Sequence, residues 1–136
     1  MLLRVTMTPA IVLELTRIWP VLSEVLHDAL DAYPFDELFI PNYSIYRPFQ
    51  AELQKSRSGY HGMDDLDNDG HRCIDIPTPT WEIAEDMAAI INPKWIYDPD
   101  RRLKLVAYAA KHGTGPHCHL QVHPNTVRRT NAGLEA

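Results

Sequence analysis

The stretch HGTGPHCHLQVH, residues 112–123, carries the clearest structural pattern in the chain. Its later histidines fall on one set of alternate positions: His117, His119 and His123. Small or apolar residues fill the other set: Cys118, Leu120 and Val122. Because successive side chains of a β-strand point to opposite faces, the pattern predicts a strand with an apolar face on the core and an imidazole face opposite. Two imidazoles two residues apart on such a strand can converge on one metal ion or one reacting group.

Prolines and capping residues predict the helices around this strand. Thr8 and Pro9 suit the N-cap and first position of a helix, and the helical spacing of apolar residues continues to about residue 33. Pro20 either kinks this helix or opens a second one. Thr80 caps a later helix, which Asn92-Pro93 ends, and we expect its Trp81 in the core.

Three further segments have the composition of strands: residues 37–40, 73–76 and 103–110. The last is the most strand-like, and the loop of residues 111–116 joins it to the histidine strand as a predicted antiparallel hairpin. Residues from about 126 onward form a polar tail. Without a repeat or a linker, residues 1–136 are expected to form one α+β domain, in which a small antiparallel sheet packs against the N-terminal and central helices.

Composition excludes several classes of protein. A net charge of -5 is not typical of a protein that binds nucleic acid through a basic surface. The same acidic charge counts against a metal-dependent nuclease. No apolar run approaches the roughly 20 residues of a membrane span, and the first residues lack the features of a signal peptide. We therefore expect cytoplasmic synthesis without a signal peptide and no membrane partner. Cys73 and Cys118 are too few for a disulfide framework. A disulfide between them is one alternative, and two buried thiols are the expected one.

A long polar loop, residues 55–71, precedes the strand predicted at residues 73–76, and loops of this length in small domains are commonly functional. It contains carboxylates at alternate positions, followed by a glycine: Asp65, Asp67, Asp69 and Gly70. This is the first half of a calcium-binding loop. Ile76 stands where an EF-hand needs a bidentate glutamate, so a Ca²⁺ site would need a carboxylate from elsewhere. The alternative is a solvated acidic turn.

His71 and Asp75 lie on either side of Cys73, and on a strand all three would share one face. A histidine and a carboxylate so placed are suitable zinc ligands. Together with the pair His117 and His119, they give a set of nitrogen and oxygen ligands of the kind found in catalytic zinc sites, where a bound water ionises near neutrality. Each motif can arise by chance, but both in one short chain are harder to dismiss.

The two motifs, His71-x-x-x-Asp75-Ile76-Pro77 and residues 114–122, resemble those of LAS-type zinc metallopeptidases. This group includes lysostaphin-like endopeptidases, D-Ala-D-Ala carboxypeptidases and the hedgehog signalling domain. The order of segments looks most like the D-Ala-D-Ala carboxypeptidase and phage endolysin branch, with Tyr46-Arg47, then residues 58–61, then an Asp on a strand and a hairpin ending in His-x-His. The resemblance covers roughly residues 40–124. It implies a hedgehog/D-Ala-D-Ala-peptidase-like fold.

The resemblance implies a ligand set for Zn²⁺. Asp75 and His119 correspond to ligands in both branches. The first ligand is His71 by the lysostaphin spacing and His61 by the carboxypeptidase layout, with a slight preference for His71 because it needs no special loop geometry.

The resemblance is less complete for the catalytic groups. Carboxypeptidase-type members carry an acidic general base three residues before the last ligand, and here that position is Pro116, which cannot move a proton. The remaining candidates for proton transfer are His117 and His112. Arg47 would stabilise the oxyanion or bind a substrate carboxylate, although its local sequence fits a surface ion pair equally well.

The expected function is therefore that of a zinc-dependent hydrolase, an endolysin-like metallopeptidase of bacteriophage origin that cleaves a peptide or amide bond in bacterial peptidoglycan and is released to the cell wall by lysis. The expected partner is a peptidoglycan peptide, with Zn²⁺ as cofactor and Ca²⁺ as a second ion if the acidic loop binds one. Because Pro116 replaces the usual base, the alternative is a structural or assembly protein of a virion that keeps the fold with little or no activity and contacts partner chains.

Overall fold

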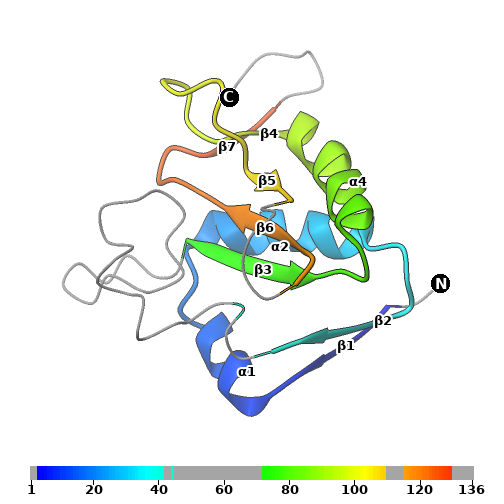
Figure 1. Cartoon of the computed structure of the whole chain (residues 1–136). Helices are drawn as coiled ribbons and strands as arrows, with labels where there is room; N and C mark the ends of the chain where they lie inside the picture. The colour runs from blue at the N-terminus through cyan, green and yellow to red at the C-terminus, as the bar shows by residue number, and fades with distance from the viewer. Residues whose placement is uncertain (1–2, 42–43, 45–71, 110–114, 130–136) are drawn as a thin grey trace.

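The computed structural model describes residues 3–41, 44, 72–109 and 115–129, and it mixes helices and strands along the chain (Figure 1). At its centre lies a three-stranded antiparallel sheet in the order β3-β6-β5. These strands are β3 Cys73–Pro77, β6 His117–Gln121 and β5 Ala107–Tyr108. Helices α2 Pro20–Ala32 and α4 Trp81–Ile91 contact β6. The expected α+β class, with a small antiparallel sheet packed on helices, is confirmed.

The apolar face of this sheet follows from the alternation in the sequence. Strand register places Ile74 opposite Leu120 and Ile76 opposite Cys118. All four side chains are fully buried and belong to one core with residues of α2 and α4. Cys73 lies one residue before Ile74 and therefore points to the opposite face. The two cysteines are buried on opposite faces and form no disulfide.

The capping signals predicted the helices correctly. Thr8 precedes α1, Pro9–Leu15, and its Oγ1 accepts a hydrogen bond from the Ile11 amide at 3.3 Å. Pro20 opens α2 as a separate helix, the second of the two outcomes considered for it. Thr80 caps α4 by accepting from the Ile83 amide at 3.2 Å. Within the described part of the chain, no helix has the length and apolar character needed to cross a bilayer.

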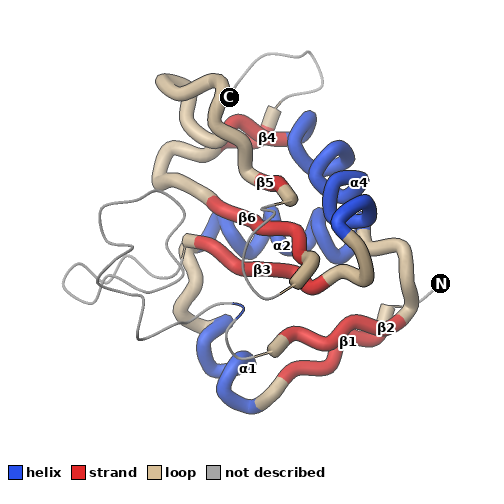
Figure 2. The backbone as a smooth tube through the Cα atoms, in the orientation of Figure 1, coloured by secondary structure: helices blue, strands red, loops and turns tan. Residues whose placement is uncertain are grey.

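A parallel pair of strands departs from the expected antiparallel arrangement. β1, Arg4–Met7, pairs in parallel with β2, Glu37–Ile40, and α1 and α2 form the connection between them (Figure 2). Parallel neighbours require such a crossover. Leu38 and Ile40 of β2 are buried, whereas Phe39 between them is exposed. The strand composition of residues 37–40 thus predicted β2 correctly, whereas its partner β1 was not predicted.

Residues 126–129 belong to the fold and are not part of a polar tail. β7, Val127–Arg128, pairs with β4, Trp95–Ile96, which follows the 3-10 helix η3, Asn92–Lys94. The guanidinium of Arg128 lies over the Trp95 ring at 4.2 Å, and its Nη1 is 3.2 Å from Asp28 Oδ2. Trp95 Nε1 donates to the same carboxylate oxygen at 2.8 Å. The last strand is therefore anchored to α2 through a largely buried carboxylate.

The prediction of one long strand over residues 103–110 is mostly wrong. Of the described residues 103–109, only Ala107–Tyr108 form strand, as β5. The preceding backbone makes turns, with the Arg101 amide bonded to Asp98 O at 2.8 Å and the Lys104 amide bonded to Arg101 O at 3.1 Å. Leu103 is 96% exposed. An apolar side chain at this position is therefore not evidence of a buried strand, and the segment meets β6 only from Leu105 onward, where the Leu105 and Val106 carbonyls accept from Gln121.

The side chain of Asn92 closes the outer edge of β5. Its Nδ2 donates to Ala107 O at 2.8 Å, and its Oδ1 accepts from the Ala107 amide at 2.9 Å. The carboxamide thus takes the place of a neighbouring strand along a short edge. Ala107 is fully buried, so these backbone groups would otherwise lose their hydrogen bonds without gaining water.

We expect Asn92→Ala to lower the free energy of unfolding by about 2–3 kcal/mol, because it removes the partners of a buried amide and a buried carbonyl. Urea denaturation of the wild-type and variant proteins measures this difference. Asn125→Ala is the matched control, since exposed Asn125 binds His123 through its backbone and not its side chain. Equal losses in the two variants would contradict the edge-closing role of Asn92.

Candidate metal centre

The second face of the central sheet carries a row of polar side chains across its three strands. Asp75 of β3 lies directly opposite His119 of β6, and His119 lies directly opposite Tyr108 of β5. His117 and Gln121 share this face because they are two residues from His119 on the same strand. The alternation of histidines therefore predicted which side chains share a face, and the strand register determines which of them meet.

Asp75 and His119 form a buried pair. The Nδ1 atom of His119 lies 2.8 Å from Asp75 Oδ1, and the two residues are 7% and 5% exposed, respectively. An ionised carboxylate only accepts hydrogen bonds, so Nδ1 carries the proton in this arrangement. Burial removes most competing water, which strengthens the attraction between the two groups. The predicted ligands Asp75 and His119 are thus brought together.

The pair fits the needs of a small divalent cation. Zinc binds imidazole nitrogen and carboxylate oxygen at about 2.0–2.2 Å. Two ligand atoms at adjacent corners of a tetrahedron with such bonds are about 3.3 Å apart. Nδ1 and Oδ1 would need to separate by only about 0.5 Å from their present 2.8 Å, and the bridging proton would leave. Binding at these atoms would therefore release protons and weaken as the pH falls.

His117 presents a different nitrogen to the same carboxylate. Its Nδ1 lies 2.7 Å from Gly115 O. A carbonyl only accepts, so Nδ1 bears hydrogen and Nε2 is the basic atom of the neutral ring. Nε2 lies 3.7 Å from Asp75 Oδ2. This hydrogen bond to a backbone carbonyl is the usual way a protein fixes the tautomer of a functional imidazole.

Two aromatic residues that contact these imidazoles had no predicted role in the site. The Tyr108 ring lies 4.8 Å from that of His119, and Trp81 lies 5.4 Å from that of His117, measured between ring centroids. Trp81 was expected in the core but is only half-buried at the start of α4. Their sequence positions gave no signal, because both contacts depend on tertiary placement.

Burial beside Asp75 also affects the acid–base behaviour of its neighbours. Burial, with smaller contributions from the charges of Cys73, Asp75 and Tyr97, raises the pKa of Tyr108 to about 12. Burial and the charge of Asp75 raise the pKa of Cys118 to about 12. Both groups therefore stay protonated at neutral pH in the metal-free protein. Cys118 lies on the core face of β6, opposite to the face that carries Asp75 and His119.

Several predicted site residues lie outside the described residues. They are the two alternatives for the first ligand, one proton-transfer candidate, the anion-binding arginine and the carboxylates of the calcium loop: His71, His61, His112, Arg47, Asp65, Asp67 and Asp69.

Another group of possible metal ligands lies on α2, where atoms of His27, Asp28 and Asp31 approach within 4.8 Å of one another. Asp28 already accepts from Trp95 Nε1 and pairs with Arg128. His27 and Asp31 are exposed. A cation would have to compete with an indole and a guanidinium for the only buried member. This group is therefore a poorer metal site than the Asp75–His119 pair.

Comparison of the chain with protein families, with curated proteins and with solved structures finds no match in any of the three.

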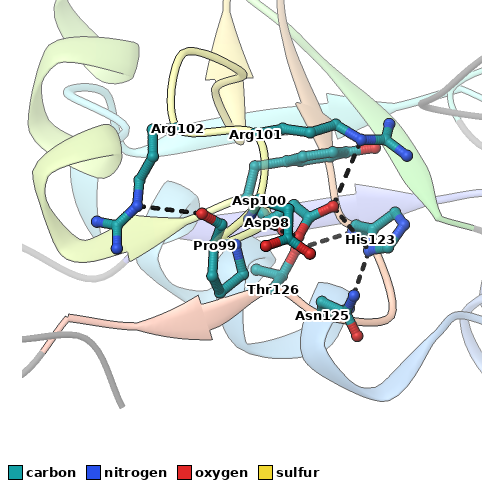
Figure 3. A network of polar contacts seen from close by, with 9 residues as sticks. Asp98, Pro99, Asp100, Arg101, Arg102, His123, Asn125 and Thr126 are labelled. Carbon is teal, nitrogen blue, oxygen red and sulfur yellow. Dashed lines mark hydrogen bonds and ion pairs between the residues drawn. The ribbon is translucent and has the colours of Figure 1, made fainter.

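His123 belongs to a separate network beyond the end of β6 (Figure 3). Its Nδ1 accepts from the Asn125 amide at 3.0 Å and lies 3.8 Å from Asp98 Oδ2. Arg101 Nε approaches the same carboxylate oxygen at 3.4 Å. Thr126 Oγ1 joins this turn to the core by donating to Tyr97 O at 2.6 Å and accepting from the His123 amide at 2.8 Å. His123 thus stabilises a turn and is not part of the candidate metal centre.

We expect His123→Asn to flatten the pH dependence of stability below neutrality. Burial, assisted by Arg101 and Arg72 and opposed by Asp98, lowers the pKa of His123 below its ordinary value. The unfolded chain therefore takes up a proton before the folded protein does, and wild-type stability falls as the pH drops below about 6.5. Asparagine cannot titrate, but its Oδ1 can still accept from the Asn125 amide.

Urea unfolding at about pH 7.5 and about pH 5.5 measures this effect, with His27→Asn as the control because His27 is exposed on α2. If His123→Asn lost as much stability over this range as the wild-type protein, the assigned environment of His123 would be wrong.

Proposed function

We propose that this chain is a zinc-dependent hydrolase, a metallopeptidase that cleaves a peptide or amide bond in bacterial peptidoglycan, and that it derives from a bacteriophage. The single observation that supports it most is the buried cross-strand pair in which Asp75 Oδ1 and His119 Nδ1 face each other at 2.8 Å. A carboxylate and an imidazole converging in this way, from motifs that resemble those of LAS-type peptidases, are the ligands that such an activity requires.

The metal ligands in this proposal are Asp75, His119 and one histidine that precedes β3 in the sequence, either His71 or His61. Bound zinc would polarise the substrate carbonyl and lower the pKa of a bound water. Asp75 and His119 come from adjacent antiparallel strands, so ladder hydrogen bonds fix the spacing of their backbones. A site on paired strands is held more precisely than one on loops, which favours catalysis.

His117 is the residue proposed to accept and return the proton. Its Nε2 is the basic nitrogen of the neutral ring and faces the Asp75 side of the site. A base must lie within hydrogen-bonding reach of the water it activates or one water away. The position of Nε2, 3.7 Å from Asp75 Oδ2, is compatible with this requirement. Arg47 remains the candidate for binding the developing anion or a substrate carboxylate.

The choice of peptidoglycan as substrate rests on the order of motifs along the chain and on the His-x-His ending of the hairpin. Pro116 supports a second candidate, a virion structural or assembly protein that keeps a peptidase-like fold with little or no activity. Pro116 stands where carboxypeptidase-type enzymes carry their base, and its carbonyl accepts from the Thr78 amide at 3.1 Å. That position contributes a backbone contact beside β3 and no acid.

We expect His119→Ala to lose both bound zinc and hydrolysis of purified peptidoglycan, because it removes one of the two paired ligand atoms. Asp75→Asn should have the same effect with less change in volume. Metal analysis after dialysis and release of soluble peptidoglycan fragments measure the two properties. His27→Ala alters the other group of possible metal ligands, on α2, and should change neither the bound zinc nor the hydrolysis. Full activity in His119→Ala would refute the ligand assignment.

We expect His117→Gln to keep zinc but to lower the hydrolysis rate by about 10²–10⁴-fold, the usual contribution of a general base. Measurement of both properties on one preparation separates the two candidate functions. Zinc binding without hydrolysis in the wild-type protein would favour the assembly protein. Unchanged hydrolysis in His117→Gln would show that another residue transfers the proton.

A further inference from the structure

The imidazole of His119 is held from two sides on the polar sheet face. Asp75 on β3 contacts its Nδ1 edge, and Tyr108 on β5 contacts the ring, with centroids 4.8 Å apart and planes inclined by 42°. Both neighbours lie directly opposite His119 in the strand register. Side chains directly opposite on antiparallel strands are the closest cross-strand neighbours. The orientation of this ring is therefore set jointly by β3 and β5.

These two contacts respond differently to metal binding. The hydrogen bond to Asp75 requires a proton on Nδ1, and that proton must leave when Nδ1 becomes a ligand. The ring contact with Tyr108 does not depend on the protonation of Nδ1. The 4.8 Å separation between the ring centroids lies in the range of favourable aromatic pairs. The contact can thus persist where the hydrogen bond cannot.

The ring of Tyr108, and not its hydroxyl, makes this contact. The hydroxyl is 3.5 Å from Gln121 Oε1, at the outer limit of a hydrogen bond. Gln121 is held elsewhere, since its Nε2 donates to Leu105 O at 2.8 Å. Loss of the hydroxyl would therefore remove one weak bond and leave the surroundings in place.

We propose that Tyr108 is a positioning residue of the candidate metal centre, and that its ring keeps the His119 imidazole turned so that Nδ1 faces Asp75 before and after a metal ion binds. This inference rests on the proposed function only in assigning His119 as a ligand. The orientation of the ring itself is a property of the metal-free protein.

The test compares Tyr108→Phe, which keeps the ring, with Tyr108→Leu, which removes it, and uses Tyr108→Met if the leucine variant does not fold. Nitrogen-15 NMR of the metal-free proteins reports the tautomer of His119. Competition with a chelator of known strength gives the zinc affinity. Trp81→Leu is the matched control, because Trp81 contacts His117 instead.

We expect wild-type protein, Tyr108→Phe and Trp81→Leu to show a single His119 tautomer with the proton on Nδ1 and zinc affinities within about twofold of one another. Tyr108→Leu should show mixed tautomers and a zinc affinity about 10–100-fold weaker, the usual cost of losing a residue that orients a ligand. A folded leucine variant with an unchanged tautomer would overturn the proposal. So would a phenylalanine variant as impaired as leucine, because the hydroxyl would then be responsible.

The NMR measurement keeps this inference separate from the proposed function. Wild-type protein that binds no zinc would refute the function, while the tautomers of the metal-free variants would still decide whether Tyr108 positions His119.

Discussion

The pairing of Asp75 with His119 across two antiparallel strands is the constraint on which the rest of this site depends. The carboxylate and the imidazole are both buried, and the hydrogen bond between them offsets part of the cost of removing each from water. The register of β3 against β6 places these two residues directly opposite each other. The same register places Ile74 opposite Leu120 on the reverse face, where the core against α2 and α4 is built. One register thus serves the polar site and the apolar core, and a slip of one residue would lose both.

The histidines near the end of the chain show how surroundings give one residue type different tasks. His119 donates from Nδ1 to a carboxylate, whereas His117 donates from Nδ1 to the Gly115 carbonyl and keeps a basic Nε2. His123 accepts at Nδ1 from a backbone amide, and its environment favours the neutral ring. A ligand, a proton acceptor and a turn-stabilising residue are therefore proposed within seven positions. The difference lies in the hydrogen-bond partner of Nδ1, which the tertiary structure supplies.

Local rules predicted the parts of the fold that local interactions determine. Thr80 caps α4, Pro20 starts α2 and the alternation at residues 117–122 separates the two faces of β6, because each depends on neighbours in the sequence. The apolar run at residues 103–110 led to a wrong prediction, since Leu103 and Leu105 are exposed and, of the described residues 103–109, only Ala107 and Tyr108 form strand. In the site, the resemblance of two sequence motifs to those of a peptidase family was enough to predict that Asp75 and His119 lie together. The contacts of Tyr108 and Trp81 with the imidazoles could not be predicted from the sequence, because they depend on strand register and on helix packing.

In the proposed zinc site, Asp75 and His119 provide an oxygen and a nitrogen ligand to one zinc ion. X-ray absorption spectroscopy of the zinc-loaded protein at one equivalent tests it most directly, because zinc–sulfur and zinc–nitrogen or –oxygen bonds differ by about 0.2–0.3 Å. We expect the zinc to be surrounded by nitrogen and oxygen only, at about 2.0–2.1 Å, with part of the imidazole scattering lost when His119 is replaced. A sulfur scatterer at about 2.3 Å, which would bring in Cys73 or Cys118, would contradict it, as would a protein that retains no zinc.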